Sequence, residues 1–178
     1  MTTDFKYLIE QLLQNKEFQK LELVGGHTTY HLEGDALAHT LLVAEFAKQR
    51  WGKFSKMHLV ALLHDVGKIT HHVKNGENDF SYPHHADGGA NELGNFIPED
   101  IPEFNEVRWY VYNHIRPMFW DESITREEAK AKLRGRFNDQ MFDNLIGLVI
   151  CDLKGSMCIP EVQQNQDKKI KFLESLIA

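Results

Sequence analysis

Apolar residues recur along most of the chain at the three- and four-residue spacing of helices that bury one face. The first such segment covers residues 4–14 and can be capped by Thr2 or Thr3. Five apolar side chains share one face of it: Phe5, Leu8, Ile9, Leu12 and Leu13. No stretch alternates apolar and polar residues for long enough to predict a half-buried strand. The pattern therefore predicts an all-α fold of about seven or eight helices.

Capping and helix-ending residues set the bounds of the other predicted helices. Asp35 can cap a helix that ends near Trp51, and Ser55 can cap one that runs from Met57 to Asp65. Gly67 then stands where a left-handed C-cap glycine is expected. The remaining predicted helices cover residues 87–93, 104–115, 125–135, 138–153 and 160–176, and residues 74–85 are predicted to form a loop.

Composition and charge exclude several classes of protein. The 178 residues, 42% of them apolar, can form one core, so we expect a single domain over residues 1–178. The longest apolar run, residues 145–151, is too short to span a membrane, and the N-terminal residues lack a signal-peptide pattern. The net charge of −6 does not favour binding to long nucleic acid. Cys151 and Cys158 cannot supply a disulfide framework and fit a reducing cytoplasm, which is the expected location.

Ten histidines are the unusual feature of the composition. Six His and Asp residues fall on apolar helix faces or at the helix ends beside them, where polar groups without partners are costly. These residues are His39, His64, Asp65, His85, His114 and Asp152. Imidazole and carboxylate groups are ligands of divalent first-row metals, and coordination would satisfy all six together. Two His and two Asp can hold one ion, and the other two His provide for a second.

The segment around the His64–Asp65 pair carries a family resemblance. The run from Ala61 to Lys68 is an apolar helix that ends in His-Asp and is followed by glycine and lysine. It resembles the signature of the HD-domain metal-dependent phosphohydrolases, which implies an all-α helical bundle. The wider pattern of that superfamily is a first His, the His-Asp pair, further His residues and a late Asp. By this resemblance the six residues named above are metal ligands, residues 27–156 form the motif-bearing core, and the terminal helices pack on it.

Within the superfamily, the motifs are most similar to those of the HD domain of bacterial tRNA nucleotidyltransferases. The similar segments are residues 31–35, 38–42, 82–85, 89–90 and 113–114. Members of that group hydrolyse phosphate esters, including 2′,3′-cyclic phosphates. These 178 residues do not include the nucleotidyltransferase domain, so the likeness does not carry tRNA over as the substrate. The likeness also suggests that His27, His31 and Glu33 border the cleft.

The six ligands also resemble those of the two-metal HD proteins, a group that includes phosphodiesterases and a few di-iron oxygenases. Lys68, Arg116 and Lys154 stand close in sequence to three of the ligands, and a phosphate beside the metals needs such donors for its non-bridging oxygens. We therefore expect a metal-dependent phosphohydrolase, either a phosphomonoesterase or a phosphodiesterase, that acts on a nucleotide or other small phosphate ester. A di-iron oxygenase and a non-catalytic nucleotide-binding signalling domain remain the alternatives.

Under this hypothesis Asp65 is both a ligand and a candidate proton acceptor, and His114 is a second-metal ligand or a general acid. His84 is the alternative ligand if the register is displaced by one residue from His85. The expected cofactor is one or two divalent ions of Mn, Fe, Co, Ni, Mg or Zn. The sequence leaves open which ion binds, which ester is cleaved and whether the chain forms a homodimer.

Overall fold

The computed structural model describes residues 2–25, 31–74 and 80–177, which contain nine α-helices, four short 3₁₀ helices and one two-stranded ladder. The α-helices are α1 (Phe5–Gln14), α2 (Lys16–Gln19), α3 (Ala36–Trp51), α4 (Lys56–Leu63), α5 (His85–Asn91), α6 (Phe104–Asn113), α7 (Arg126–Ala131), α8 (Asp139–Gly155) and α9 (Pro160–Ser175). The 3₁₀ helices are η1 (Lys20–Leu23), η2 (Val66–Ile69), η3 (Leu93–Asn95) and η4 (Arg116–Phe119), and the strands are β1 (Val73–Lys74) and β2 (Phe80–Ser81). The predicted all-α class is confirmed.

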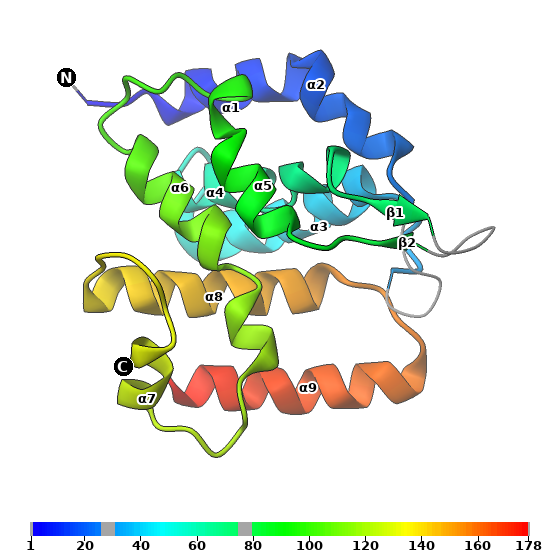
Figure 1. The fold of residues 1–178 in the computed structure, drawn as a ribbon, viewed down its shortest axis with the longest axis vertical. Helices are drawn as coiled ribbons and strands as arrows, with labels where there is room; N and C mark the ends of the chain where they lie inside the picture. Colours follow the sequence, from blue (N-terminus) through cyan, green and yellow to red (C-terminus); the bar gives the residue numbers. More distant parts are fainter. Residues whose placement is uncertain (1, 26–30, 75–79, 178) are drawn as a thin grey trace.

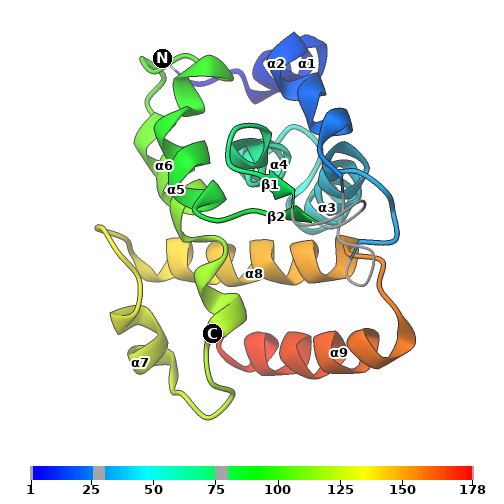
Figure 2. The same ribbon diagram turned by 45° about the vertical axis from the view of Figure 1, so that its right-hand side comes forward.

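The helices are stacked in layers (Figure 1). Helices α1 and α2 cross one end of the molecule, and α3, α4, α5 and α6 form the middle. Helix α8 runs beneath this middle layer and packs on α3 and α4. Figure 2 shows from a second side that α9 runs antiparallel to α8 along the far edge, joined to it by a short link at one end. The fold therefore has a helical core, with α9 and the short α7 standing outside α8.

Capping side chains begin three of the main helices as the sequence predicts, but the cap of α1 is Asp4, which accepts a hydrogen bond from the Tyr7 N–H, and not the predicted Thr2 or Thr3. Asp35 accepts a hydrogen bond from the Ala38 N–H at the start of α3, and Ser55 accepts one from His58 N–H at the start of α4. Asn138 caps α8. Thr125 forms the predicted capping box of α7, in which its side chain and that of residue 128 each bond the other's backbone.

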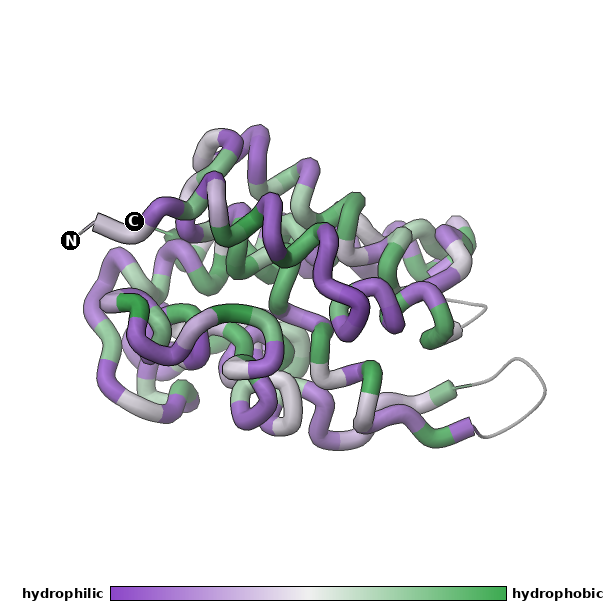
Figure 3. Tube along the Cα trace, turned by 90° about the horizontal axis from the view of Figure 1, so that it is seen from above, coloured by the Kyte–Doolittle hydropathy of each residue, from purple (hydrophilic) through white to green (hydrophobic). Residues whose placement is uncertain are grey.

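Helix α4 is the centre of the core. Every side chain from Met57 to Leu63 is buried, so this helix has no solvent face and packs against α3, α6, α8 and α1. Figure 3 shows hydrophobic segments gathered in the middle of the molecule, with hydrophilic ones toward the outside. No helix within the described ranges is long and apolar enough to cross a membrane.

The structure differs from the predicted elements in several places. Helix α2, only four residues long, was not predicted, and it brings the number of α-helices in the described residues to nine. Helix α5 begins at His85, two residues before the predicted start, and α7 ends at Ala131 instead of near Gly135. The predicted loop over residues 74–85 contains β2, which pairs with β1 over two residues each. Elements this short carry too few residues for a periodic pattern.

Gly67 has a different role from the predicted left-handed C-cap. It lies inside η2 and is not among the glycines with positive φ, which are Gly34, Gly52 and Gly135. A Cβ at position 67 would stand 2.0 Å from the His85 carbonyl oxygen and 2.4 Å from the Gly89 nitrogen. The glycine is therefore needed because the backbones of η2 and α5 touch, and this contact brings the end of α4 against the start of α5.

Candidate metal centre and cleft

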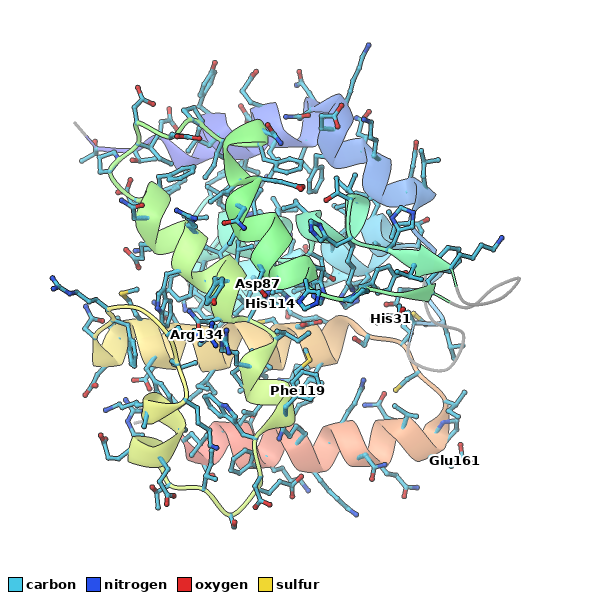
Figure 4. The ribbon with its side chains drawn as sticks, viewed as in Figure 1. His31, Asp87, His114, Phe119, Arg134 and Glu161 are labelled. Atoms are coloured by element: carbon cyan, nitrogen blue, oxygen red, sulfur yellow. The ribbon has the colours of Figure 1, made fainter. Side chains whose placement is uncertain are left out.

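The fold brings the six sequence-predicted ligands together into one buried group, which we call the His/Asp cluster. Its members come from five helices or helix ends, and none has more than 6% of its surface exposed. They are His39 on α3, His64 and Asp65 after α4, His85 at the start of α5, His114 after α6 and Asp152 on α8. Figure 4 shows His114 where α6 ends, beside α8.

Two of the histidines sit in matching local structures. His64 ends α4 and His114 ends α6, both in helical conformation, and each is followed two residues later by a 3₁₀ helix. In each ring Nδ1 lies 2.7 Å from the carbonyl oxygen three residues earlier, that of Ala61 or Val111. A helix end has carbonyls without intrahelical partners, and the ring N–H satisfies one of them. The contact also fixes the direction of the ring.

The other two histidines are held in the same way. His85 Nδ1 lies 2.8 Å from the Tyr82 carbonyl oxygen, and His39 Nδ1 lies 2.9 Å from Glu33 Oε1, although off the best hydrogen-bond direction. In all four rings Nδ1 therefore faces an acceptor, and Nε2 faces the cluster. A metal-binding histidine is oriented in this way in many proteins, because a donating Nδ1–H leaves the Nε2 lone pair for the ion.

The Asp65 carboxylate divides the cluster into two halves. Its Oδ2 lies 3.2 Å from His64 Nε2 and 3.8 Å from His39 Nε2. Its Oδ1 lies 3.4 Å from His85 Nε2 and 3.6 Å from His114 Nε2. Asp152 Oδ1 completes the first half, at 3.0 Å from His39 Nε2 and 3.9 Å from His64 Nε2. Asp65 is therefore placed to contribute one oxygen to each of two ligand groups.

The donor atoms fit divalent ions. His85 Nε2 and His114 Nε2 are 3.3 Å apart, and because each Nδ1 faces a carbonyl, neutral rings would turn two lone pairs toward each other. His64 Nε2 is buried and has no hydrogen-bond partner among the described residues. Ligand atoms that each stand about 2.0–2.2 Å from one ion are about 3–3.5 Å apart, close to the separations found here. The cluster therefore has the donor set and spacing for one or two divalent metal ions.

The two halves differ in their proton affinity. Burial would lower the pKa of His39, but its hydrogen bond with Asp152 and its close contact with the Glu33 carboxylate raise it to about 9. Burial lowers the pKa of His85 to about 4, with only partial compensation by Asp65. Although burial opposes the shift, nearby His64 and Lys68 hold the pKa of Asp65 well below its usual range, and the hydrogen bond with His39 lowers that of Asp152. Both carboxylates are thus ionised at neutral pH.

Glu33 contacts the cluster from outside. Its buried carboxylate lies 2.8 Å from His31 Nδ1 through the same Oε1 that faces His39, and its Oε2 accepts a hydrogen bond of 3.0 Å from the Met157 N–H. Burial raises its pKa, but the bonds with His31 and His39 lower it to about 2. The sequence placed Glu33 and His31 near the cleft only through family likeness, because a residue before a helix cap carries no periodic signal. His27 lies outside the described residues.

A cleft of about 680 Å³ opens onto the cluster. One wall carries Asp65, His85, His114 and Asp152, together with Lys68, Tyr82 and His31. The opposite wall is formed by α9, and apolar side chains of η4 and α8 lie between them. Helix α9 was not expected to contribute, since the amphipathic pattern of residues 160–176 predicts only a helix that packs on the core. In η4 the expected residue was Arg116, whereas Met118 is the one that lines the cleft.

The three sequence-predicted phosphate donors are placed differently. Lys68 lines the cleft, and its Nζ lies 2.6 Å from Asp65 Oδ2. Arg116 does not line it: its guanidinium lies 5.0 Å from the centre of the Tyr112 ring. Lys154 is exposed and does not line the cleft either. It follows Asp152 by two residues on α8, and this spacing points its side chain well away from that of Asp152. Sequence proximity to a ligand was a poor guide in those two cases.

The alternative ligand His84 is also outside the cluster. It is exposed, has a left-handed backbone conformation with φ of 61°, and precedes α5. His85 is the first residue of α5 and is buried, so the helix start turns His85 and not His84 toward the centre. His85, the residue expected from the sequence, is therefore the one whose ring joins the other five residues of the cluster.

Comparison with known proteins agrees with this geometry. A search of curated proteins and a search of solved structures each find no match. The family model described as HD domain matches residues 36–143, more than half of the chain, and this range includes every member of the His/Asp cluster except Asp152. The helical fold, the buried His-Asp pair after α4 and this match together show that the chain belongs to the HD domain family.

Proposed function

We propose that this protein is a metal-dependent phosphohydrolase that cleaves a nucleotide or another small phosphate ester. The observation that carries the proposal is the Asp65 carboxylate, which faces two histidines with each oxygen and lies at the wall of an open cleft. A carboxylate shared in this way is typical of centres that hold two ions a few ångströms apart. The cleft volume of about 680 Å³ lies within the range of small-molecule sites.

Bound divalent ions would supply Lewis acidity, which neutralises charge on the phosphoryl oxygens. Lys68 adds a positive charge at the same wall, where its Nζ is within hydrogen-bond distance of Asp65. An ammonium group in this position can donate to a non-bridging phosphate oxygen. This cation beside the cluster supports phosphoryl transfer, because every phosphate ester brings an anionic group that it can neutralise.

The structure favours a ligand role over a base role for Asp65. A carboxylate whose pKa is far below its usual range accepts a proton poorly. His114 lines the cleft, and its Nε2 faces Asp65 and His85, so we assign it as a ligand of the second ion. If His114 binds no ion, it is the cluster residue best placed to act as a general acid.

Turnover of phosphate esters by the Mn²⁺-loaded protein tests the proposal. The panel contains nucleoside monophosphates, 2′,3′-cyclic nucleotides and a chromogenic phosphodiester. The cyclic nucleotides are included because of the motif likeness to tRNA nucleotidyltransferase HD domains. Lys68→Ala should lower kcat/KM by about 10- to 150-fold, the usual cost of losing a charge-assisted contact of about 1.5–3 kcal/mol. The matched control is Lys20→Ala, which removes another lysine that pairs with a carboxylate three residues away, at 2.7 Å, but is exposed and does not line the cleft.

Several outcomes would contradict the proposal. A metal-loaded protein that hydrolyses none of these esters is not a phosphohydrolase of small nucleotides. Oxygen consumption that depends on bound iron would replace the proposal with the di-iron oxygenase, and tight nucleotide binding without turnover would replace it with the signalling domain. Equal effects of Lys68→Ala and Lys20→Ala would remove Lys68 from the substrate site.

A further inference from the structure

The wall of the cleft opposite the His/Asp cluster is one face of α9. The four α9 residues that line the cleft are Val162, Asn165, Gln166 and Lys169. They are spaced three, four and seven residues from the first, which is the spacing of a single helix face. This face therefore looks across the cleft toward the cluster along about two helical turns.

The N-terminal half of α9 is not part of the hydrophobic core. The residues of α9 that are buried, Ile170 and Leu173, lie in its C-terminal half. There Lys169 Nζ donates to the Trp120 carbonyl oxygen at 2.5 Å, and Arg126 bonds the carbonyl oxygen of Leu176. The helix is anchored by this end, and its other half is held beyond α8 (Figures 1 and 2). Packing of the core alone does not account for the position of residues 160–168.

The cleft-facing side of α9 carries two adjacent side-chain amides. Asn165 is exposed and Gln166 is half-buried, and both line the same cleft as the apolar side chains of Val162, Ile115 and Met118. The Cys158 thiol, in the link before α9, lies 3.3 Å from Gln166 Oε1 and 3.6 Å from Gln163 Oε1 and can donate to either. An amide offers a donor and an acceptor side by side, the pattern that pairs with the edge of a nucleobase, and apolar side chains suit the flat faces of the base.

We propose that this face of α9 binds the base of a nucleoside phosphate whose phosphate group lies at the His/Asp cluster. The inference rests on the proposed phosphohydrolase function and adds to it the part of the molecule that selects the substrate. The selecting residues lie beyond the range 36–143 matched by the HD domain family. The metal centre would accept many phosphate esters, and α9 would decide which organic group is held beside it.

The experiment compares ligands that differ only in the base. The Mn²⁺-loaded protein is titrated calorimetrically with inorganic phosphate, with ribose 5-phosphate and with the four common nucleoside 5′-monophosphates. Phosphate release is followed in parallel, and phosphorothioate analogues replace any ester that is hydrolysed. We expect at least one nucleotide to bind about 10- to 100-fold more tightly than ribose 5-phosphate, as two neutral hydrogen bonds would provide.

The double variant Asn165→Ala/Gln166→Ala should lose most of this difference. Its affinity for the preferred nucleotide should fall about 10- to 100-fold, and its affinities for ribose 5-phosphate and inorganic phosphate should stay within about twofold. The matched control is Gln164→Ala/Lys168→Ala, which changes two exposed residues of the same helix that do not line the cleft. This control should bind all ligands as the wild type does, and thermal unfolding should show both variants folded.

Failure of this inference and failure of the proposed function give different results. If the wild type binds phosphate and ribose 5-phosphate but prefers no nucleotide, α9 does not bind a base. The same conclusion follows if the Asn165/Gln166 variant weakens all ligands equally, because the helix would then only support the fold, or if the control variant has the same effect. If inorganic phosphate and every ester fail to bind the metal-loaded protein, the phosphohydrolase function itself is wrong, and the inference is overturned with it.

Discussion

Metal binding by this protein should release a proton from His39, and its affinity should therefore rise with pH above neutrality. The His39 ring lies between two carboxylates, with Nε2 3.0 Å from Asp152 and Nδ1 2.9 Å from Glu33, and these contacts raise its pKa to about 9. A protonated ring cannot bind an ion through Nε2. At pH 7 only about 1% of such rings are deprotonated, which lowers the apparent affinity by about 100-fold, or about 2.7 kcal/mol.

The predicted signature is a slope of about one proton per ion between pH 7 and 8, which flattens as the pH passes 9. His85 should add nothing to this slope, because its pKa of about 4 leaves the ring neutral throughout the range. The assay is competition between the protein and a chelator for Zn²⁺ or Co²⁺ at several pH values, with proton release measured by calorimetry in buffers of different ionisation enthalpy.

Glu33→Gln provides the perturbation. Removal of one of the two carboxylates should lower the pKa of His39 and so reduce the number of protons released at pH 8. Glu45→Gln, on the exposed surface of the same helix as His39, is the matched control and should behave as the wild type does. If metal binding releases no proton between pH 7 and 9, or if Glu33→Gln releases as many as the wild type, the assignment of His39 as a protonated ligand is refuted.

The metal-free protein should show the opposite trend in stability. On folding, the pKa of His39 rises from 6.5 to about 9, so the protonated ring stabilises the fold fully below pH 6.5, and this contribution is lost as the pH rises through 9. The full shift corresponds to about 3 kcal/mol in the free energy of unfolding. Urea denaturation of the metal-free chain from pH 6.5 to 9 measures it, and stability that does not fall over this range would contradict the prediction.

Three further predictions concern the metal count and the fold. His85→Ala and His114→Ala should each lower the metal content from two ions per chain to one, as measured by elemental analysis, and an unchanged content would place both rings outside the metal shell. Gly67→Ala should lower the free energy of unfolding by about 3 kcal/mol or more, because the new Cβ would stand 2.0 Å from the His85 carbonyl oxygen. Urea denaturation measures this change, and a loss below about 1 kcal/mol would show that η2 and α5 can move apart at little cost in stability. Thr125→Ala, which removes a capping box away from the cluster, should cost about 1 kcal/mol without changing the metal content, and a loss of metal would show that α7 is coupled to the site.

Several features of the structure could be predicted because they depend on residues close in sequence. The caps formed by Asp35, Ser55 and Thr125 need only an N–H three residues ahead, and all three form. The six members of the His/Asp cluster were identifiable for a related reason. A histidine or aspartate on an apolar helix face or at its end has to be satisfied inside the protein, and a shared ion is the simplest way to satisfy six at once.

Other expectations failed where direction matters more than proximity. Lys68, Arg116 and Lys154 all stand near a ligand in sequence, but only Lys68 lines the cleft. Two residues along a helix turn a side chain by about 200°, and the 3₁₀ helices that follow His64 and His114 change the direction again. Gly67 was predicted as a helix cap, but a glycine is needed there because the backbone contacts α5, whose residues lie about twenty positions later.

The sequence by itself determined the helical class, the main helix starts and which residues form the His/Asp cluster, because periodicity, capping and the cost of burying polar groups act locally. Only the tertiary structure decided which histidines each oxygen of Asp65 faces, that Glu33 contacts His39, and that α9 faces the cluster across a cleft. These features depend on the relative positions of helices far apart in the chain, which are set by how whole apolar faces pack together, and no local pattern contains that information.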